Sequence, residues 1–207
     1  MADFDKIIIA CYEPGNVEFI GGKMNNDLRQ LEEAVQEAVQ LVYKNDKHLI
    51  QYHCNFNSKT GKTRLSKKDY HVNERSIVFR FGCYLQSILC KRNLFTGYDL
   101  DCEYNRNGDQ PKKLPRFENG TYPDIILHKR GSNEENTLVM EFKGYWCKAS
   151  EALENDMKKI EMFTKQQGIY KFSVGMLVFL GKRLEDTKIK VVVNGYVDRV
   201  ICLTEYI

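Results

Sequence analysis

The sequence predicts a single α/β domain built on a mixed four-stranded sheet flanked by helices. Its 207 residues suffice for one hydrophobic core, and 43% hydrophobic and 29% charged residues are typical of a globular protein. Stretches with the three-to-four-residue period of an amphipathic helix alternate with short apolar runs typical of strands. Between residues 74 and 180 the order is helix, three strands, helix, strand. We take these residues as the core of one domain spanning 1–207.

The chain before the core predicts a hairpin, a helix and a basic loop. An apolar run at 6–12 precedes Pro14-Gly15, which suggests an appended hairpin. Residues 26–44 carry apolar side chains at helical spacing, and a short strand is expected around 49–53. The polar stretch that follows contains five cations, Lys59, Lys62, Arg64, Lys67 and Lys68. This basic loop could contact phosphates, although a solvated surface loop explains it equally well.

The core begins with a predicted helix from Asn73, its N-cap, to about Lys91. The other core elements follow in order: strands at 98–104, 122–129 and 137–146, a helix after Ser150, and a strand at 172–180. The second and third strands are predicted to form a hairpin. Beyond the core, Asn194-Gly195 predicts the turn of a C-terminal hairpin, which we expect to be an extension of the domain.

Three charged residues stand within the two central apolar strands. Asp124 lies near the start of the first, and Glu141 and Lys143 are two apart on the second, so they share a face. Buried carboxylates are costly unless they are paired, hydrogen-bonded or bound to metal. Two carboxylates could hold Mg²⁺ while a lysine stabilises the transition state of phosphodiester hydrolysis. The alternative is a buried salt-bridge network without a metal.

The motif formed by Pro123-Asp124, sixteen intervening residues and Glu141-Phe142-Lys143 resembles the signature of the PD-(D/E)XK nuclease superfamily. The surrounding order of elements is similar as well. The resemblance implies a restriction-endonuclease-like core (αβββαβ) and Mg²⁺-dependent hydrolysis of nucleic acid, DNA in most relatives, with Mn²⁺ able to substitute. It also implies that Asp124 and Glu141 bind the metal and that Lys143 is catalytic.

The resemblance implies a third carboxylate, because relatives often add one from the first core helix. Glu74 matches that role as a catalytic and metal-binding residue, since it lies on the inward stripe of the helix. It could instead only complement the helix N-terminus. Asp101 or Glu103, on one face of the preceding strand, could supply the ligand in its place. Asp156 and Lys159 on the later helix could also face the site, but abundant charge there favours a surface position.

One further polar residue, His128, shares the strand face of Asp124 and could act as a proton shuttle. A histidine satisfied by hydrogen bonds is the commoner explanation. The seven cysteines are scattered without any Cys-x-x-Cys pair, so we predict no disulfide framework or zinc site. We expect most of the thiols to be buried.

The net charge of +3 permits a polyanionic partner without requiring one. No apolar run reaches the ~20 residues that cross a bilayer, and the start lacks the pattern of a secretory signal. We therefore expect a cytoplasmic nuclease with no membrane partner. The alternatives are a catalytically silent nucleic-acid-binding module of the same fold and a hydrolase of smaller phosphate esters. A homodimer would provide two sites for one duplex. The sequence leaves open the oligomeric state, DNA against RNA, endo against exo action, target specificity and pathway.

Overall fold

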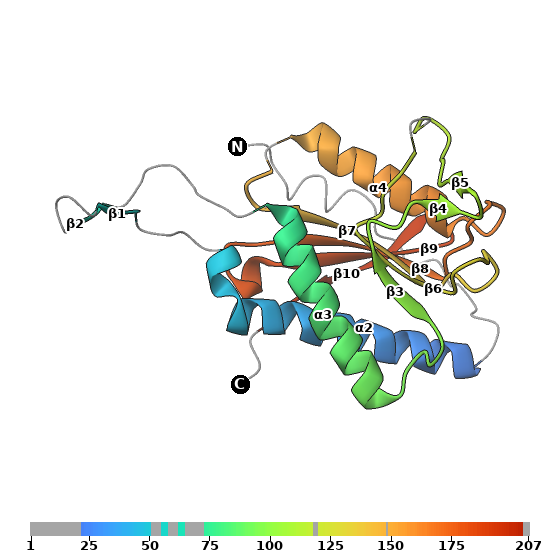
Figure 1. Ribbon diagram of the computed structural model, residues 1–207, viewed down its shortest axis with the longest axis horizontal. Coiled ribbons are helices and arrows are strands. Elements are labelled where there is room, and N and C mark those ends of the chain that lie inside the picture. Colours follow the sequence, from blue (N-terminus) through green and yellow to red (C-terminus); the bar gives the residue numbers. More distant parts are fainter. Residues whose placement is uncertain are drawn as a thin grey trace.

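The computed structural model describes residues 22–50, 55–57, 62–64, 73–117, 120–147 and 149–204 (Figure 1). The helices are α2 (Gly22–Asn45), α3 (Glu74–Arg92) and α4 (Ser150–Thr164). The strands of the main sheet are β3 (Asp99–Cys102), β6 (Ile125–His128), β7 (Leu138–Gly144), β8 (Val174–Leu180), β9 (Lys188–Val193) and β10 (Tyr196–Cys202). Smaller elements are β1 (Asn55–Asn57), β2 (Lys62–Arg64), β4 (Arg106–Asn107), β5 (Gln110–Pro111) and the 3₁₀ helices η1 (Lys47–Leu49) and η2 (Leu184–Asp186).

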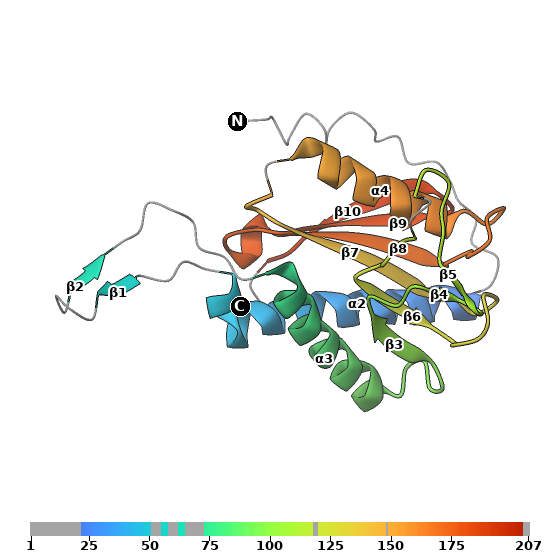
Figure 2. The ribbon, with the colours of Figure 1, turned by 45° about the horizontal axis from the view of Figure 1, so that its top comes forward.

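The main sheet lies between two layers of helices, with α2 and α3 on one face and α4 on the other (Figures 1 and 2). The strand order is β10-β9-β8-β7-β6-β3. All neighbours are antiparallel except β7 and β8, which are parallel because α4 connects them as a crossover. The α/β class is therefore confirmed, and the predicted core elements occur in sequence with the small β4–β5 pair inserted between β3 and β6.

The two faces of β7 carry different chemistry. Leu138, Met140 and Phe142 pack with α2 and α3 in the larger hydrophobic core, where the ring centroids of Phe81 and Phe142 are 4.8 Å apart. The alternate residues Val139, Glu141 and Lys143 face α4 because side chains alternate along a strand. Only the first of these three is apolar. The α4 side of the sheet therefore combines a small core with a cluster of charge.

Two local predictions are confirmed by the backbone. The side chain of Asn73 accepts a hydrogen bond from the backbone N–H of Arg75 at 3.0 Å, as an N-cap does. Asn194 and Gly195 have φ of 50° and 83°, the positive values that a tight hairpin turn between β9 and β10 requires. The N-cap matters for function because it fixes where α3 begins, next to the end of β7.

The main sheet has six strands instead of the predicted four. The C-terminal hairpin is no extension, because β9 pairs with β8 and brings the buried Ile189, Val191 and Val192 into the cores. The prediction of a short strand around 49–53 is also wrong for its first residue, because Leu49 is the last residue of the 3₁₀ helix η1. Residues 51–54 lie outside the described part of the chain.

The cysteines differ from the prediction as well. All five that the structure describes are free, and four of them, Cys83, Cys90, Cys102 and Cys202, are exposed. The expectation that most thiols are buried is therefore wrong. On α3 the reason is geometric, because Cys83 and Cys90 each follow a buried residue by two positions and so lie off the inward stripe.

Several expected features fall outside the described residues. These are the hairpin predicted before residue 22 and, within the basic loop, Lys59, Lys67 and Lys68. Lys62 and Arg64 lie in β2, which pairs with β1. Within the described ranges, no helix is long and apolar enough to cross a membrane.

Candidate active site

The pairing of β6 with β7 brings the two predicted metal ligands together. Ile125 is opposite Met140 in the antiparallel register, so Asp124 and Glu141 occupy the next positions of the same ladder. One carboxylate oxygen of Asp124 accepts a hydrogen bond from the backbone N–H of Phe142 at 2.7 Å. This bond fixes Asp124 against the strand that carries Glu141 and Lys143.

Glu141 is the most buried carboxylate of the motif, with 3% of its surface exposed. Its Oε1 atom is buried without a hydrogen-bond partner among the described residues, and the Nζ of Lys159 lies 3.7 Å from it. Burial, together with the charges of Asp124 and Asp156, raises the pKa of Glu141 well above its usual value. A carboxylate in this position is costly to ionise unless a cation approaches it.

Asp124 shares this electrostatic environment. Burial raises its pKa to about 6, and the charges of Asp156 and Glu74 add to the effect, while the hydrogen bond from Phe142 opposes it. Two adjacent carboxylates with raised pKa values mark a place where negative charge is concentrated and incompletely compensated. Such perturbed groups gather at functional sites more often than elsewhere.

Lys143 is held by acidic side chains from two helices. Its Nζ lies 2.8 Å from Oδ2 of Asp156 on α4 and 3.3 Å from Oε2 of Glu74 on α3, and it donates to the carbonyl of Phe142 at 3.1 Å. Burial favours the neutral amine, but the bond with Asp156 and the charge of Glu74 outweigh it and raise the pKa of Lys143. Lys143 is therefore a fixed positive charge.

Glu74 faces the cluster, as its place on the inward stripe predicted. Besides the ion pair with Lys143, its Oε1 accepts the backbone N–H of Gly144 at 3.2 Å. A side chain at Gly144 would collide with the ring of Trp146, so this end of β7 requires glycine. Asn73 already caps the N-terminus of α3. The contacts of Glu74 with Lys143 and Gly144 therefore give it a role beyond complementing that helix end.

Asp156 and Lys159 belong to the same cluster, so the surface position favoured from the sequence is wrong. Asp156 is 5% exposed, and its Oδ1 lies 2.7 Å from the Nζ of Lys159. The physical reason is the buried stripe of α4, in which Asp156 follows Leu153 by three positions and precedes Ile160 by four. That spacing was readable from the sequence and would have placed Asp156 inside.

The other candidates for a third carboxylate are engaged elsewhere. Asp101 accepts a hydrogen bond from Nε2 of His128 at 2.9 Å and one from Nε of Arg130 at 2.8 Å. Glu103 forms an exposed ion pair with Arg75 at 2.6 Å. His128 lies at the opposite end of β6 from Asp124, and its bond to Asp101 supports the reading of a satisfied histidine.

The cluster contains more acidic than basic side chains. Four carboxylates, those of Glu74, Asp124, Glu141 and Asp156, surround the two ammonium groups of Lys143 and Lys159. No three His, Cys, Asp or Glu side chains of the described ranges form a ready-made metal cage. Mg²⁺, however, is commonly held by one or two carboxylates with water and phosphate oxygens completing its shell. The oxygen donors of Asp124 and Glu141, one of them buried without a hydrogen-bond partner, fit such an ion.

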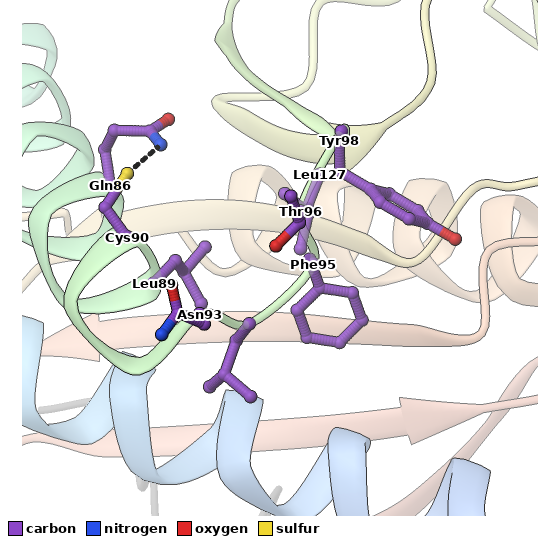
Figure 3. Close-up of a pocket in the computed structure, with 10 residues that line it drawn as sticks. Gln86, Leu89, Cys90, Asn93, Phe95, Thr96, Tyr98 and Leu127 are labelled. Atoms are coloured by element: carbon purple, nitrogen blue, oxygen red, sulfur yellow. Dashed lines mark hydrogen bonds between the residues drawn. The ribbon is translucent and has the colours of Figure 1, made fainter.

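A separate hollow lies at the other end of α3, between that helix and the loop leading to β3 (Figure 3). It has a volume of about 360 Å³, and its lining includes Leu89, Phe95, Tyr98 and Leu127. Gln86 donates a hydrogen bond to Cys90 on its wall. Because no acidic or basic side chain lines this hollow, it does not share the chemistry of the charged cluster.

Comparison with known proteins adds no relative, because neither the protein-family models nor the curated proteins contain a match to this chain.

Proposed function

We propose that this protein is a Mg²⁺-dependent nuclease of the PD-(D/E)XK type that hydrolyses phosphodiester bonds in nucleic acid, with DNA as the expected substrate. The observation that carries the proposal is the half-buried cluster in which Glu74, Asp124, Glu141 and Asp156 outnumber Lys143 and Lys159. The order α3, β3, β6, β7, α4, β8 supports a restriction-endonuclease-like core, to which β9 and β10 add two strands. DNA is named because most members of the superfamily that the motif resembles act on it.

The residues of the cluster divide the work of such a reaction. Asp124 and Glu141 would hold the metal, which when bound supplies an activated water and neutralises charge on the phosphate. Lys143 presents a fixed positive charge beside these carboxylates, suited to the negative charge that develops on the phosphate. Glu74 orients the Lys143 ammonium and holds the end of β7 through Gly144, and it remains available as a third ligand.

The alternative is a nucleic-acid-binding module that keeps the fold without turnover. In that case the ion pairs of Lys143 with Asp156 and Glu74 would only hold α3 and α4 against β7. The excess of carboxylates over ammonium groups argues against this alternative, because a network kept only for stability has no need of a buried Glu141 oxygen whose nearest cation among the described residues lies at 3.7 Å.

A cleavage assay tests the proposal directly. Supercoiled, linear and single-stranded DNA, and RNA, are incubated with the protein in Mg²⁺, Mn²⁺ or chelator. We expect cleavage only with a metal ion, its loss in Asp124→Asn, and its retention in the control Asp109→Asn, which alters an exposed aspartate. The preferred substrate decides DNA against RNA, and cleavage of closed circles decides endo against exo action. Binding of nucleic acid without cleavage in any condition would establish the module instead.

A further inference from the structure

The position of Lys159 suggests a role that the motif does not describe. Among the described residues, Lys159 is the only basic side chain within 4.0 Å of a Glu141 carboxylate oxygen. Its Nζ is held more closely by Oδ1 of Asp156, at 2.7 Å, and lies 5.8 Å from the ring centre of Phe117. The ammonium of Lys159 thus lies between Glu141, the most buried carboxylate of the site, and Asp156.

A divalent ion on Glu141 would change the surroundings of Lys159. In the metal-free protein the ammonium partly neutralises Glu141, and Glu141 in turn favours the charged form of Lys159. A divalent cation at the same carboxylate would replace that attraction by repulsion between two positive charges. The ammonium would still be anchored by Asp156, but it would need a new anion on its other side.

The anion that arrives next in the proposed reaction is the phosphate of the substrate. We infer that Lys159 serves the site twice: it is the counter-ion of Glu141 before the metal binds, and it binds a substrate phosphate oxygen after the metal has taken Glu141. This inference rests on the proposed nuclease function. The side chain of Lys159 is 22% exposed, so a phosphate oxygen arriving from solvent could reach it.

Asp156 acts in this scheme as a positioning residue. One carboxylate holds both ammonium groups of the site, Lys143 through Oδ2 and Lys159 through Oδ1. Because Asp156 sits on the buried stripe of α4, between Leu153 and Ile160, its own position is fixed by the packing of the helix. The spacing between the two ammonium groups is therefore set by one rigid element.

The two roles predict opposite effects of removing one charge. Lys159→Met removes the cation that competes for Glu141, so the metal should bind more tightly, by roughly tenfold, because a nearby like charge is lost. The same change removes the phosphate contact, so KM for nucleic acid should rise and cleavage should fall. A lysine with a purely structural role would weaken both or neither. Lys159→Arg, which keeps a positive charge, should restore most of the substrate affinity.

The experiment compares Lys159→Met with Lys158→Met, which removes an exposed lysine one position away on α4. Calorimetric titration with Mn²⁺ alone at pH 8.5 measures the first role, and KM and kcat on the best substrate measure the second. If Lys159→Met does not fold, Lys159→Gln provides the same comparison and keeps a hydrogen-bond donor for Asp156.

Tighter Mn²⁺ binding with a raised KM in Lys159→Met, and no change in Lys158→Met, supports the inference. Unchanged or weaker Mn²⁺ binding in Lys159→Met overturns it, whether or not the protein cleaves nucleic acid. An unchanged KM in an active Lys159→Met overturns the phosphate contact and leaves the nuclease proposal standing. If the unmodified protein binds Mn²⁺ but cleaves nothing, the nuclease proposal fails, and the second role of Lys159 fails with it.

Discussion

Two charged clusters lie on the α4 face of the sheet, at opposite ends of β6, and they differ in how completely their charges are paired. At one end, Asp101 accepts hydrogen bonds from His128 and Arg130. Burial raises the pKa of Asp101, but these bonds outweigh it and leave the pKa below its usual value. At the other end, Asp124 and Glu141 both have raised pKa values.

The difference separates a structural ion network from a candidate site. Asp101 has its partners within the protein, so its cluster gains nothing from a further cation. Within the described part of the chain, Glu141 has a buried oxygen without a hydrogen-bond partner, and the only cation near it is Lys159 at 3.7 Å, so its cluster would gain from a further cation. Both clusters contain carboxylates on core strands, and only the balance of charge distinguishes them. The following predictions test that distinction.

The largest effect is expected for Glu141→Gln. The substitution removes a metal ligand and one excess negative charge, so cleavage should fall by roughly 10²–10³-fold or more. In chelator the variant should unfold at a higher temperature than the unmodified protein, because a buried carboxylate with a raised pKa is replaced by a neutral amide. Cleavage assays and thermal melts on one sample measure both. A lower melting temperature together with normal cleavage would contradict the assignment of Glu141.

Lys143→Met should separate catalysis from stability. The Met side chain keeps much of the apolar stem but removes the charge beside the proposed metal, so cleavage should fall by roughly 10²–10³-fold while Mn²⁺ still binds. The substitution also removes the ammonium group with which both Asp156 and Glu74 form ion pairs. The metal-free variant should therefore be less stable, by about 3 kcal/mol, and Mg²⁺ should recover part of this loss. Unchanged cleavage in a folded variant would contradict the catalytic role of Lys143.

The pH dependence of stability should have opposite signs at the two clusters. The raised pKa of Asp124 means that the unfolded chain ionises first as pH rises. Its contribution to stability is full below its unfolded pKa near 3.8 and is lost as pH passes about 6, an effect of up to about 3 kcal/mol. In chelator, urea unfolding should show Asp124→Asn gaining stability relative to the unmodified protein over this range. A difference that does not change with pH would argue against the raised pKa.

The sequence predicted the helices and strands better than it predicted which strands pair in the sheet. The helices and core strands follow from local periods, such as the inward stripe of Ile77, Phe81 and Leu85. The pairing of β9 with β8 could not be read in this way, because a hairpin signal specifies its own turn and not the strand against which it packs. For the same reason the predicted sheet was two strands too narrow.

The candidate site was predictable in part. Asp124, Glu141 and Lys143 stand out because charges interrupt apolar strands, and Glu74 because it continues an apolar stripe. Asp156 was missed although its spacing from Leu153 and Ile160 was visible, since neighbouring surface charges on α4 hid it. The contacts of Lys143 with two helices depend on how α3 and α4 pack on the sheet, which no local pattern specifies.

The smallest effect on activity is expected for Asp101→Asn, which removes the carboxylate that pairs with His128 and Arg130. Arg130 and His128 lose their shared anion, so stability at pH 7 should fall by about 1–2 kcal/mol, while Mn²⁺ affinity and cleavage should stay close to those of the unmodified protein. Because the pKa of Asp101 is lowered, its contribution exists above the unfolded pKa and is lost as pH falls through the folded value. Urea unfolding at neutral and acid pH should therefore show the difference from the unmodified protein shrinking in acid, with the exposed Asp109→Asn as control. If Asp101→Asn instead abolished cleavage at unchanged stability, paired charge could no longer be taken as the mark of a structural cluster, and Asp101 would have to join the site.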